Sequence, residues 1–316
     1  MFSGKSYNNK SSAQKLNKKK KIMEIAATTI DQILSNLASQ PDPAGKNLDL
    51  ETQRKQIKTE LYSSAPKDAM MRVMTRMQFQ EAPNLDEIDW ESELSTFQPI
   101  EYPQYYLQPF HSVLGGYLSE TAAVGNRVAM EAILENAHPR KSLGVRDEIA
   151  QLFPEDARHI LDLGAGIGDD AAAIARYLPS ATITAWDASP FMIVVGRLYH
   201  KDIPNLHWKH GLVEKTELPD NSVDALNMTY LLHECPDEIK QIILAECRRI
   251  LSPGGLLVVT DTLPGDLHSH RGFFEPYKEQ WLKVNPDKLL QEAGFVNIKA
   301  HQFAYPTWTR VGEKPN

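Results

Sequence analysis

Short apolar runs alternate with amphipathic stretches along the second half of the chain, from His159 onward. This alternation is typical of a parallel, doubly wound α/β sheet. It predicts a Rossmann-like, seven-stranded, mostly parallel sheet with helices on both faces. The last two strands are joined by a short turn near Pro306, so the sheet should end in an antiparallel pair. The strands are expected at His159–Leu163, Ala181–Trp186, Leu206–Lys209, Ala225–Thr229, Leu256–Thr260, Val296–His301 and Thr307–Val311, and the helices at Asp170–Tyr177, Phe191–His200, Pro236–Leu251 and Pro286–Ala293.

The first half of the chain has a different pattern. Apolar residues recur at helical spacing in three stretches between residues 22 and 77, and Ser119 is placed to cap a further helix that runs to about Asn136. Between them, PIEYPQYYLQPFHSVLGGYLS is too rich in proline and glycine for a regular element and too aromatic for an idle linker. We therefore expect a basic, disordered tail over residues 1–21, a helical cap with an aromatic lid over 22–140, and the sheet domain over 141–316.

Composition adds a charge asymmetry. The 316 residues carry a net charge of −7, but residues 1–23 hold seven lysines and no acid, which leaves the remainder at −14. Nucleic-acid binding depends on neutralising phosphates, so an acidic body disfavours a nucleic-acid partner. The lysine run is interpreted as a solvated tail. The expected partner is a small molecule, and the expected assembly is a monomer or a homodimer.

The cysteine pattern and the lengths of the apolar runs indicate the cellular location of the chain. Cys235 and Cys247 have neither a CxxC partner nor paired histidines, which argues against a disulfide framework and a zinc site. The sequence DLHSH, with Asp266, His268 and His270, has ligand-type residues at alternate spacing in a loop, and we expect no metal there. No apolar run is long enough to span a membrane, and the start lacks a secretory signal. A cytoplasmic location is expected; an acid-poor start leaves an organellar transit peptide open.

Three glycines follow the first predicted strand in the run ILDLGAGIGDD, at Gly164, Gly166 and Gly168. A strand that turns sharply beneath a ligand needs residues without a Cβ, because the backbone must adopt positive φ and approach the ligand closely. The dinucleotide fingerprint GxGxxG fails here, since Asp169 occupies its last position. Asp169 and Asp170 would also repel a pyrophosphate at the start of the helix. This loop disfavours a nicotinamide oxidoreductase.

An acidic residue ends the next predicted strand. Asp187, in ITAWDAS, follows Asp162 by 25 residues, at the position where a carboxylate can accept hydrogen bonds from both ribose hydroxyls. Alone, Asp187 is equally consistent with an ordinary turn aspartate. Together with the glycine loop it predicts a nucleoside site.

The run from Ile160 to Asp187 resembles motif I and the acidic loop of class I S-adenosylmethionine-dependent methyltransferases. The blocks HGLVEKTELPDNSVDALNMTYLLHEC, ILSPGGLLVVTD and LLQEAGF resemble the ubiquinone- and menaquinone-type branch that methylates small molecules. YYLQPFHSVLGGYLSETAA is similar to the lead-in of cyanobacterial and plastid methyltransferases and of the methyltransferase domain of ovothiol-synthesising enzymes.

This resemblance implies S-adenosylmethionine as the cofactor, bound at the ends of the first four strands. Where the family's GDAxxLP block carries an aspartate for the adenine amino group, this chain has Leu212, so Glu214 or a backbone carbonyl would have to serve. Met192 is placed either against the adenine face or in the core. The cofactor-binding residues that the resemblance implies are Asp162, Gly164, Ala165, Gly166, Gly168, Asp187, Ala188, Met192, Gly211, Leu212, Val213, Thr229 and Tyr230.

Methyl transfer from a sulfonium is an in-line displacement, so the protein mainly aligns the reacting atoms and excludes water. A weakly nucleophilic substrate atom also needs a base. His233, in TYLLHE after the fourth strand, is the first candidate for a base or substrate anchor, and Glu234 is the second; a structural histidine is the alternative reading. The lid residues, which would face the sulfonium or simply pack the loop, are Tyr105, Tyr106, Phe110, His111 and Tyr117.

The sequence thus predicts an enzyme that transfers a methyl group from S-adenosylmethionine to an O, N or C nucleophile of a small molecule. The alternative is a methyltransferase-like binding or regulatory module with weak or no catalysis. Leu212 and the long N-terminal extension keep that alternative open, whereas the intact glycines and Asp187 argue against it.

Overall fold

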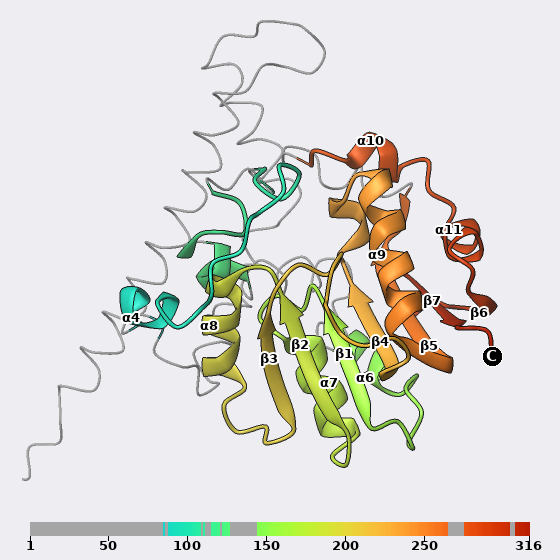
Figure 1. The fold of residues 1–316 in the computed structure, drawn as a ribbon, viewed down its shortest axis with the longest axis horizontal. Coiled ribbons are helices and arrows are strands. Elements are labelled where there is room, and N and C mark those ends of the chain that lie inside the picture. Colours follow the sequence, from blue (N-terminus) through green and yellow to red (C-terminus); the bar gives the residue numbers. More distant parts are fainter. Residues whose placement is uncertain are drawn as a thin grey trace, which may run out of the picture.

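The computed structural model describes residue 85, residues 88–108, residue 110, and residues 115–120, 122–126, 144–264, 275–303 and 307–316. Its centre is one seven-stranded sheet in the order β3-β2-β1-β4-β5-β7-β6 (Figure 1). The first five strands in sequence are parallel, and β7 pairs antiparallel with both β5 and β6. The strands are β1 (His159–Leu163), β2 (Thr182–Asp187), β3 (Leu206–His210), β4 (Val223–Thr229), β5 (Leu251–Thr262), β6 (Val296–His301) and β7 (Thr307–Glu313).

The predicted fold class and all seven predicted strands are confirmed. Six strands lie within two residues of their expected bounds, whereas β5 begins at Leu251, five residues before its expected start. The expected antiparallel pair is also present. Within this pair β6 forms the edge of the sheet, and β7 lies between β5 and β6.

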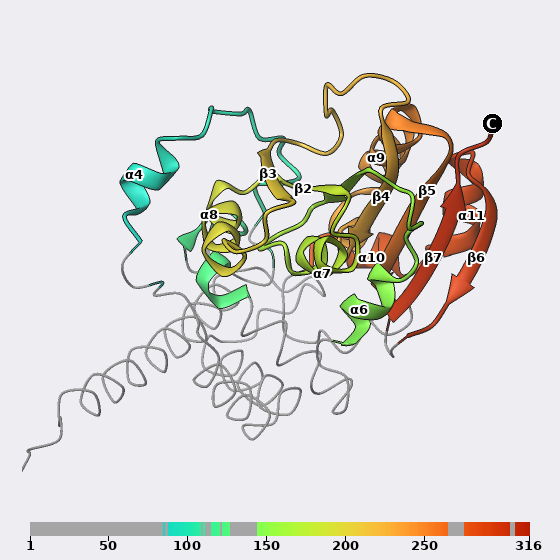
Figure 2. The ribbon, with the colours of Figure 1, turned by 90° about the horizontal axis from the view of Figure 1, so that it is seen from below.

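Helices cover both faces of this sheet, and Figure 2 shows α9 on one side with α6 and α7 on the other. The helices are α4 (Trp90–Leu94), α6 (Gly144–Ala150), α7 (Asp169–Tyr177), α8 (Pro190–Tyr199), η3 (Leu232–Glu234), α9 (Asp237–Ile250), α10 (Lys278–Trp281) and α11 (Pro286–Glu292). The four long predicted helices correspond to α7, α8, α9 and α11, whereas α4, α6, α10 and η3 were not predicted.

The central strands are buried on both faces, which explains their unbroken apolar runs. Alternate residues of one strand enter different cores: Leu161 faces the core beneath α9 and α11, while Ile160 faces the core beneath α6 and α7. On β4, Leu226 likewise faces the core beneath α9 and α11, and Ala225 faces the core beneath α6 and α7. Because side chains alternate across a strand, a shift by one residue would exchange the two cores, so the register is strongly specified.

Several expectations concern residues outside the described part of the chain. They are the basic tail, the three helical stretches between residues 22 and 77, His111, and the loop residues Asp266, His268 and His270. The helix predicted from Ser119 is described over residues 122–126, where the Ser119 hydroxyl accepts a hydrogen bond from the Ala122 N–H at 3.2 Å. Within the described residues, no helix is both long enough and apolar enough to cross a membrane.

Candidate functional site

The glycine loop begins directly after β1, and its three glycines all have positive φ, at +68°, +56° and +76° for Gly164, Gly166 and Gly168. A Cβ at Gly164 would lie 2.8 Å from the Leu231 side chain, and one at Gly168 would lie 2.4 Å from the Trp208 ring. A Cβ at Gly166 would meet no atom within 4 Å. Gly168 is therefore required by packing as well as by φ. Gly164 is required mainly by φ, because the end of the Leu231 side chain can shift, and Gly166 borders open space that a ligand can enter.

Asp187 ends β2 beside this loop. Its Oδ2 accepts a hydrogen bond from the Gly166 N–H at 2.7 Å, and its Oδ1 accepts one from the Ser189 N–H at 2.7 Å. Burial raises the pKa of Asp187 to about 6, although the two N–H donors oppose that shift. The carboxylate is thus ionised at neutral pH, and each oxygen retains a further acceptor position for a ligand hydroxyl.

Asp162 lies in β1, directly before the glycine loop, and bonds to the neighbouring elements. Its Oδ2 accepts from the Ala171 N–H at 3.0 Å and its Oδ1 from the Asn227 side-chain amide at 2.8 Å. Burial, followed by the nearby charge of Asp170, raises the pKa of Asp162 to about 8. Through these two hydrogen bonds, Asp162 connects the strand before the glycine loop to α7 and to β4. Asn227 was not predicted as a site residue from the sequence. The feature that could have indicated it is a polar residue within the otherwise apolar run of β4.

Asp169 and Asp170, the acids that disfavour a dinucleotide at the start of α7, form ion pairs with Arg146 on α6. Arg146 Nη2 lies 3.7 Å from an oxygen of Asp169, and Arg146 Nε lies 3.7 Å from an oxygen of Asp170. His200 Nε2 lies 3.1 Å from the other Asp169 oxygen. The start of α7 is therefore held by ion pairs within the protein, and α6 supplies the cation.

The loop after β3 closes the other side of Asp187. The Gly211 N–H donates to the Asp187 carbonyl at 3.0 Å, which brings Leu212 and Val213 alongside the end of β2. Leu212 is half-buried and offers no carboxylate, as its sequence position indicated. Glu214 accepts a hydrogen bond from the Tyr105 hydroxyl and so faces the lid.

Tyr102 joins the same edge of the site. Its hydroxyl donates to the Ala188 carbonyl at 2.8 Å and lies 3.2 Å from His210 Nε2, which is itself 3.0 Å from that carbonyl. Burial, and then the charge of Asp187, raise the pKa of Tyr102 to about 12. Neither Tyr102 nor His210 was predicted from the sequence, although His210 directly precedes Gly211, which was.

Met192 lies in α8 and is 2% exposed, packed with Ile167 and Val195. Of the two readings of Met192, this placement corresponds to the core residue. Thr229 and Tyr230 end β4 next to the glycine loop. Tyr230 has φ +55°, an uncommon conformation for a bulky residue, and its N–H donates to the Thr260 carbonyl at 2.8 Å.

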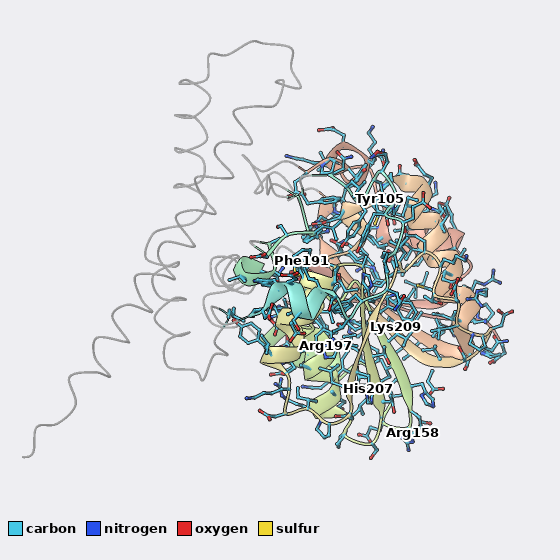
Figure 3. All side chains as sticks on the ribbon, turned by 60° about the vertical axis from the view of Figure 1, so that its left-hand side comes forward. Tyr105, Arg158, Phe191, Arg197, His207 and Lys209 are labelled. Atoms are coloured by element: carbon cyan, nitrogen blue, oxygen red, sulfur yellow. The ribbon has the colours of Figure 1, made fainter. Side chains whose placement is uncertain are left out.

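The aromatic lid packs over the carboxyl ends of the strands. Figure 3 shows Tyr105 at the end of the sheet opposite to Arg158 and His207, which lie at the amino ends of β1 and β3. The ring centroids of Tyr106 and Tyr117 are 6.4 Å apart, and those of Phe110 and Tyr117 are 5.4 Å apart.

Tyr117 connects the lid to both sides of the site. Its carbonyl accepts from the Ser189 hydroxyl at 2.7 Å, and its hydroxyl donates to Glu234 Oε1 at 2.6 Å. Burial, followed by the charge of Glu234, raises the pKa of Tyr117 well above its usual value. The four described lid residues named by the sequence, Tyr105, Tyr106, Phe110 and Tyr117, therefore lie together; His111 is outside the described residues.

His233 and Glu234 lie in η3, directly after β4, and both are buried. His233 Nδ1 lies 2.7 Å from Asp261 Oδ1, and the His233 N–H donates to Asp261 Oδ2 at 3.2 Å. His233 Nε2 lies 3.4 Å from Glu234 Oε1. Burial lowers the pKa of His233, but the carboxylates of Asp261 and then Glu234 outweigh it and raise the pKa to about 10.

Asp261 is fully buried and was missed by sequence analysis. Asp261 could have been predicted from the sequence. It follows the apolar run LLVVT of β5 and so lies near the carboxyl end of a strand, where α/β sheets place their functional groups. The same rule had singled out Asp187 and His233.

Comparison with known proteins identifies the central part of this fold. Residues 160–255 match the family model described as a methyltransferase domain. Demethylmenaquinone methyltransferase of Staphylococcus aureus is 26% identical over 170 residues, which cover 45% of this chain and 70% of that protein. The match confirms the predicted enzyme class, because the chain carries a methyltransferase domain, and S-adenosylmethionine is the cofactor expected of it.

One solved structure shares the fold over the whole chain. Human N-acetylserotonin methyltransferase in complex with S-adenosylmethionine has a TM-score of 0.52 and 16% identity, covering 99% of this chain and 100% of that one. Phosphoethanolamine N-methyltransferase 2 of Haemonchus contortus, in complex with S-adenosyl-L-methionine, has a TM-score of 0.44 and 14% identity over 55% of this chain. This chain spans about half of that protein, 53% of its length.

Proposed function

We propose that this chain binds S-adenosylmethionine across the carboxyl ends of β1, β2 and β3 and transfers its methyl group to a small molecule. The observation that carries the proposal is the open space at Gly166 directly beside the ionised carboxylate of Asp187. A glycine with positive φ lets the backbone approach a ligand, and a carboxylate with free acceptor positions suits ribose hydroxyls.

The residues around that space fit the rest of the cofactor. Leu212 and Val213 offer an apolar wall at the end of β3, suited to one face of an adenine ring. Tyr106 and Tyr117 lie on the side of Glu234, where aromatic faces and a carboxylate favour a sulfonium cation. When bound, the cofactor supplies an electrophilic methyl carbon. Ala165, Gly166, Ala188 and Thr229 are proposed as backbone contacts around it.

The chain's own contribution is alignment and the exclusion of water. The lid rings of Tyr106, Phe110 and Tyr117 contact one another above the strand ends and keep the reacting atoms away from solvent. The Asp261 carboxylate fixes the orientation of the His233 ring through Nδ1, so Nε2 faces Glu234. His233 and Glu234 are proposed as the groups that anchor the substrate or accept its proton.

Small-molecule methylation is supported by the relatives' names rather than by contacts of this chain. The Staphylococcus aureus relative is named for demethylmenaquinone, and the human structure for N-acetylserotonin. We propose a substrate of comparable size that is admitted beneath the lid, beside the hydrogen-bonded pair of Tyr117 and Glu234. The lid contacts support a bound molecule enclosed on the side of β4.

Isothermal calorimetry of the full chain with S-adenosylmethionine and with S-adenosylhomocysteine tests the proposal. We expect one site per chain. Asp187→Ala should weaken binding by about 1.5–3 kcal/mol, because charge-assisted hydrogen bonds to the ribose are lost. Asp202→Ala, at an exposed position after α8, is the matched control and should bind as the wild type does. Absence of binding by either ligand would leave a methyltransferase-like module without its cofactor and refute the proposal.

A further inference from the structure

Three side chains on the lid side of the sheet bring ligand atoms to one point. His233, Glu234 and Glu275 each offer one nitrogen or oxygen atom, and these atoms all lie within 4.8 Å of one another. We propose that these three residues form a binding site for a divalent transition-metal ion such as Zn²⁺. His233 and Glu234 come from η3, and Glu275 comes from the segment that leads into α10.

The spacing of the donor atoms fits an ion. His233 Nε2 and Glu234 Oε1 are 3.4 Å apart. A charge-assisted N–H···O bond is typically about 2.7–2.9 Å, so this pair is longer than a direct hydrogen bond of that kind. Two ligands that each lie about 2.1 Å from a tetrahedral zinc ion are about 3.4 Å apart. The observed separation is therefore compatible with two ligands of one tetrahedral ion.

The surroundings of His233 supply an independent observation. Histidine ligands usually bond a carboxylate through the ring nitrogen that does not bind the metal, which fixes both the ring and its tautomer. Asp261 provides that carboxylate at 2.7 Å from Nδ1, and it is itself held by the N–H groups of His233 and Thr262. Tyr117 similarly orients Glu234 through its hydroxyl. The His233 ring and the Glu234 carboxylate are thus held in place near Glu275.

The donor set indicates the class of metal. An imidazole nitrogen favours zinc, iron or copper over magnesium or calcium, and the two carboxylates compensate a double positive charge. Three protein ligands are typical of zinc sites that keep a position open for water or a substrate atom. Binding would replace the proton on Nε2, so one proton would be released as the metal–nitrogen bond forms, and His233 would then anchor a substrate through the metal instead of accepting its proton. No metal site was predicted from the sequence, because Glu275 lies far from TYLLHE along the chain.

A metal titration of the full, tag-free chain tests the site. After dialysis against EDTA, the protein is titrated with Zn²⁺ against a chromogenic competitor, and bound zinc is counted by mass spectrometry after gel filtration. We expect one ion per chain and a rise in melting temperature. Glu275→Gln keeps the shape of the side chain but should weaken binding at least tenfold. Asp261→Asn should weaken it about 10- to 100-fold through the second shell of the site.

Controls separate this site from other ligands on the chain. Glu279→Gln, exposed on α10, should bind Zn²⁺ as the wild type does. The pair His268→Ala and His270→Ala tests the DLHSH loop and should also leave the affinity unchanged. Glu234→Gln is the second ligand variant, should Glu275→Gln melt below the wild type in EDTA.

Two results would overturn the metal site: the absence of stoichiometric Zn²⁺ binding, or a loss of binding that follows the DLHSH histidines instead of Glu275. The titration is performed without cofactor. Its outcome is therefore independent of the calorimetry with S-adenosylmethionine, and either proposal can fail alone.

Discussion

Replacing single glycines of the loop with alanine separates its packing role from its binding role. At Gly168, a new Cβ would lie 2.4 Å from the Trp208 ring and 3.1 Å from a second ring atom. The positive φ adds about 1–2 kcal/mol of strain for an L-residue, and overpacking adds about 1–3 kcal/mol. Gly168→Ala should therefore destabilise the protein by about 2–5 kcal/mol.

Gly166→Ala should behave differently. Its Cβ would meet no protein atom within 4 Å, so only the φ strain of about 1–2 kcal/mol applies. The new methyl group would instead occupy the space proposed for the cofactor, and the affinity for S-adenosylhomocysteine should fall at least tenfold. Urea unfolding and calorimetry on both variants measure the two effects separately. If Gly166→Ala bound the ligand as tightly as the wild type, the ligand would not lie where we place it.

Three further predictions concern the acids and the lid. Affinity for S-adenosylhomocysteine should fall as pH drops below about 6, because Asp187 becomes protonated through its pKa of about 6; a flat profile between pH 5 and 7.5 would contradict this. Tyr117→Phe should cost about 1.5–3 kcal/mol in urea unfolding, since Glu234 loses a buried donor; an unchanged midpoint would count against that contact. Asp162→Asn leaves one oxygen for two donors, so its NH2 group would face either the Ala171 N–H or the Asn227 amide; this should destabilise the fold by about 1–3 kcal/mol, which thermal unfolding would reveal.

The accuracy of the sequence-based bounds has a physical origin. β1 was predicted at its observed bounds because both faces of a central strand are buried, so its apolar run begins and ends with the strand. α9 carries acids in its first turn and arginines in its last, and these signals located it to within one residue at each end. Local chemistry of this kind can be read from the chain directly.

The features that sequence analysis missed all depend on contacts between distant segments. β7 inserts between β5 and β6, an order that a linear pattern does not encode. α6 spans seven residues with only modest helical signals, and Arg146 becomes meaningful only where it meets Asp169. Asp261 and Glu275 likewise gain their importance from folding beside His233.

The central claim is that Asp187 holds the ribose of a cofactor lying against Gly166. A thermodynamic cycle tests it most directly, by calorimetry of wild type and Asp187→Ala with S-adenosylhomocysteine and with its analogue lacking both ribose hydroxyls. We predict that the wild type loses at least tenfold in affinity for the analogue, whereas Asp187→Ala binds both ligands equally weakly. Equal sensitivity of the two proteins to removal of the hydroxyls would contradict the claim.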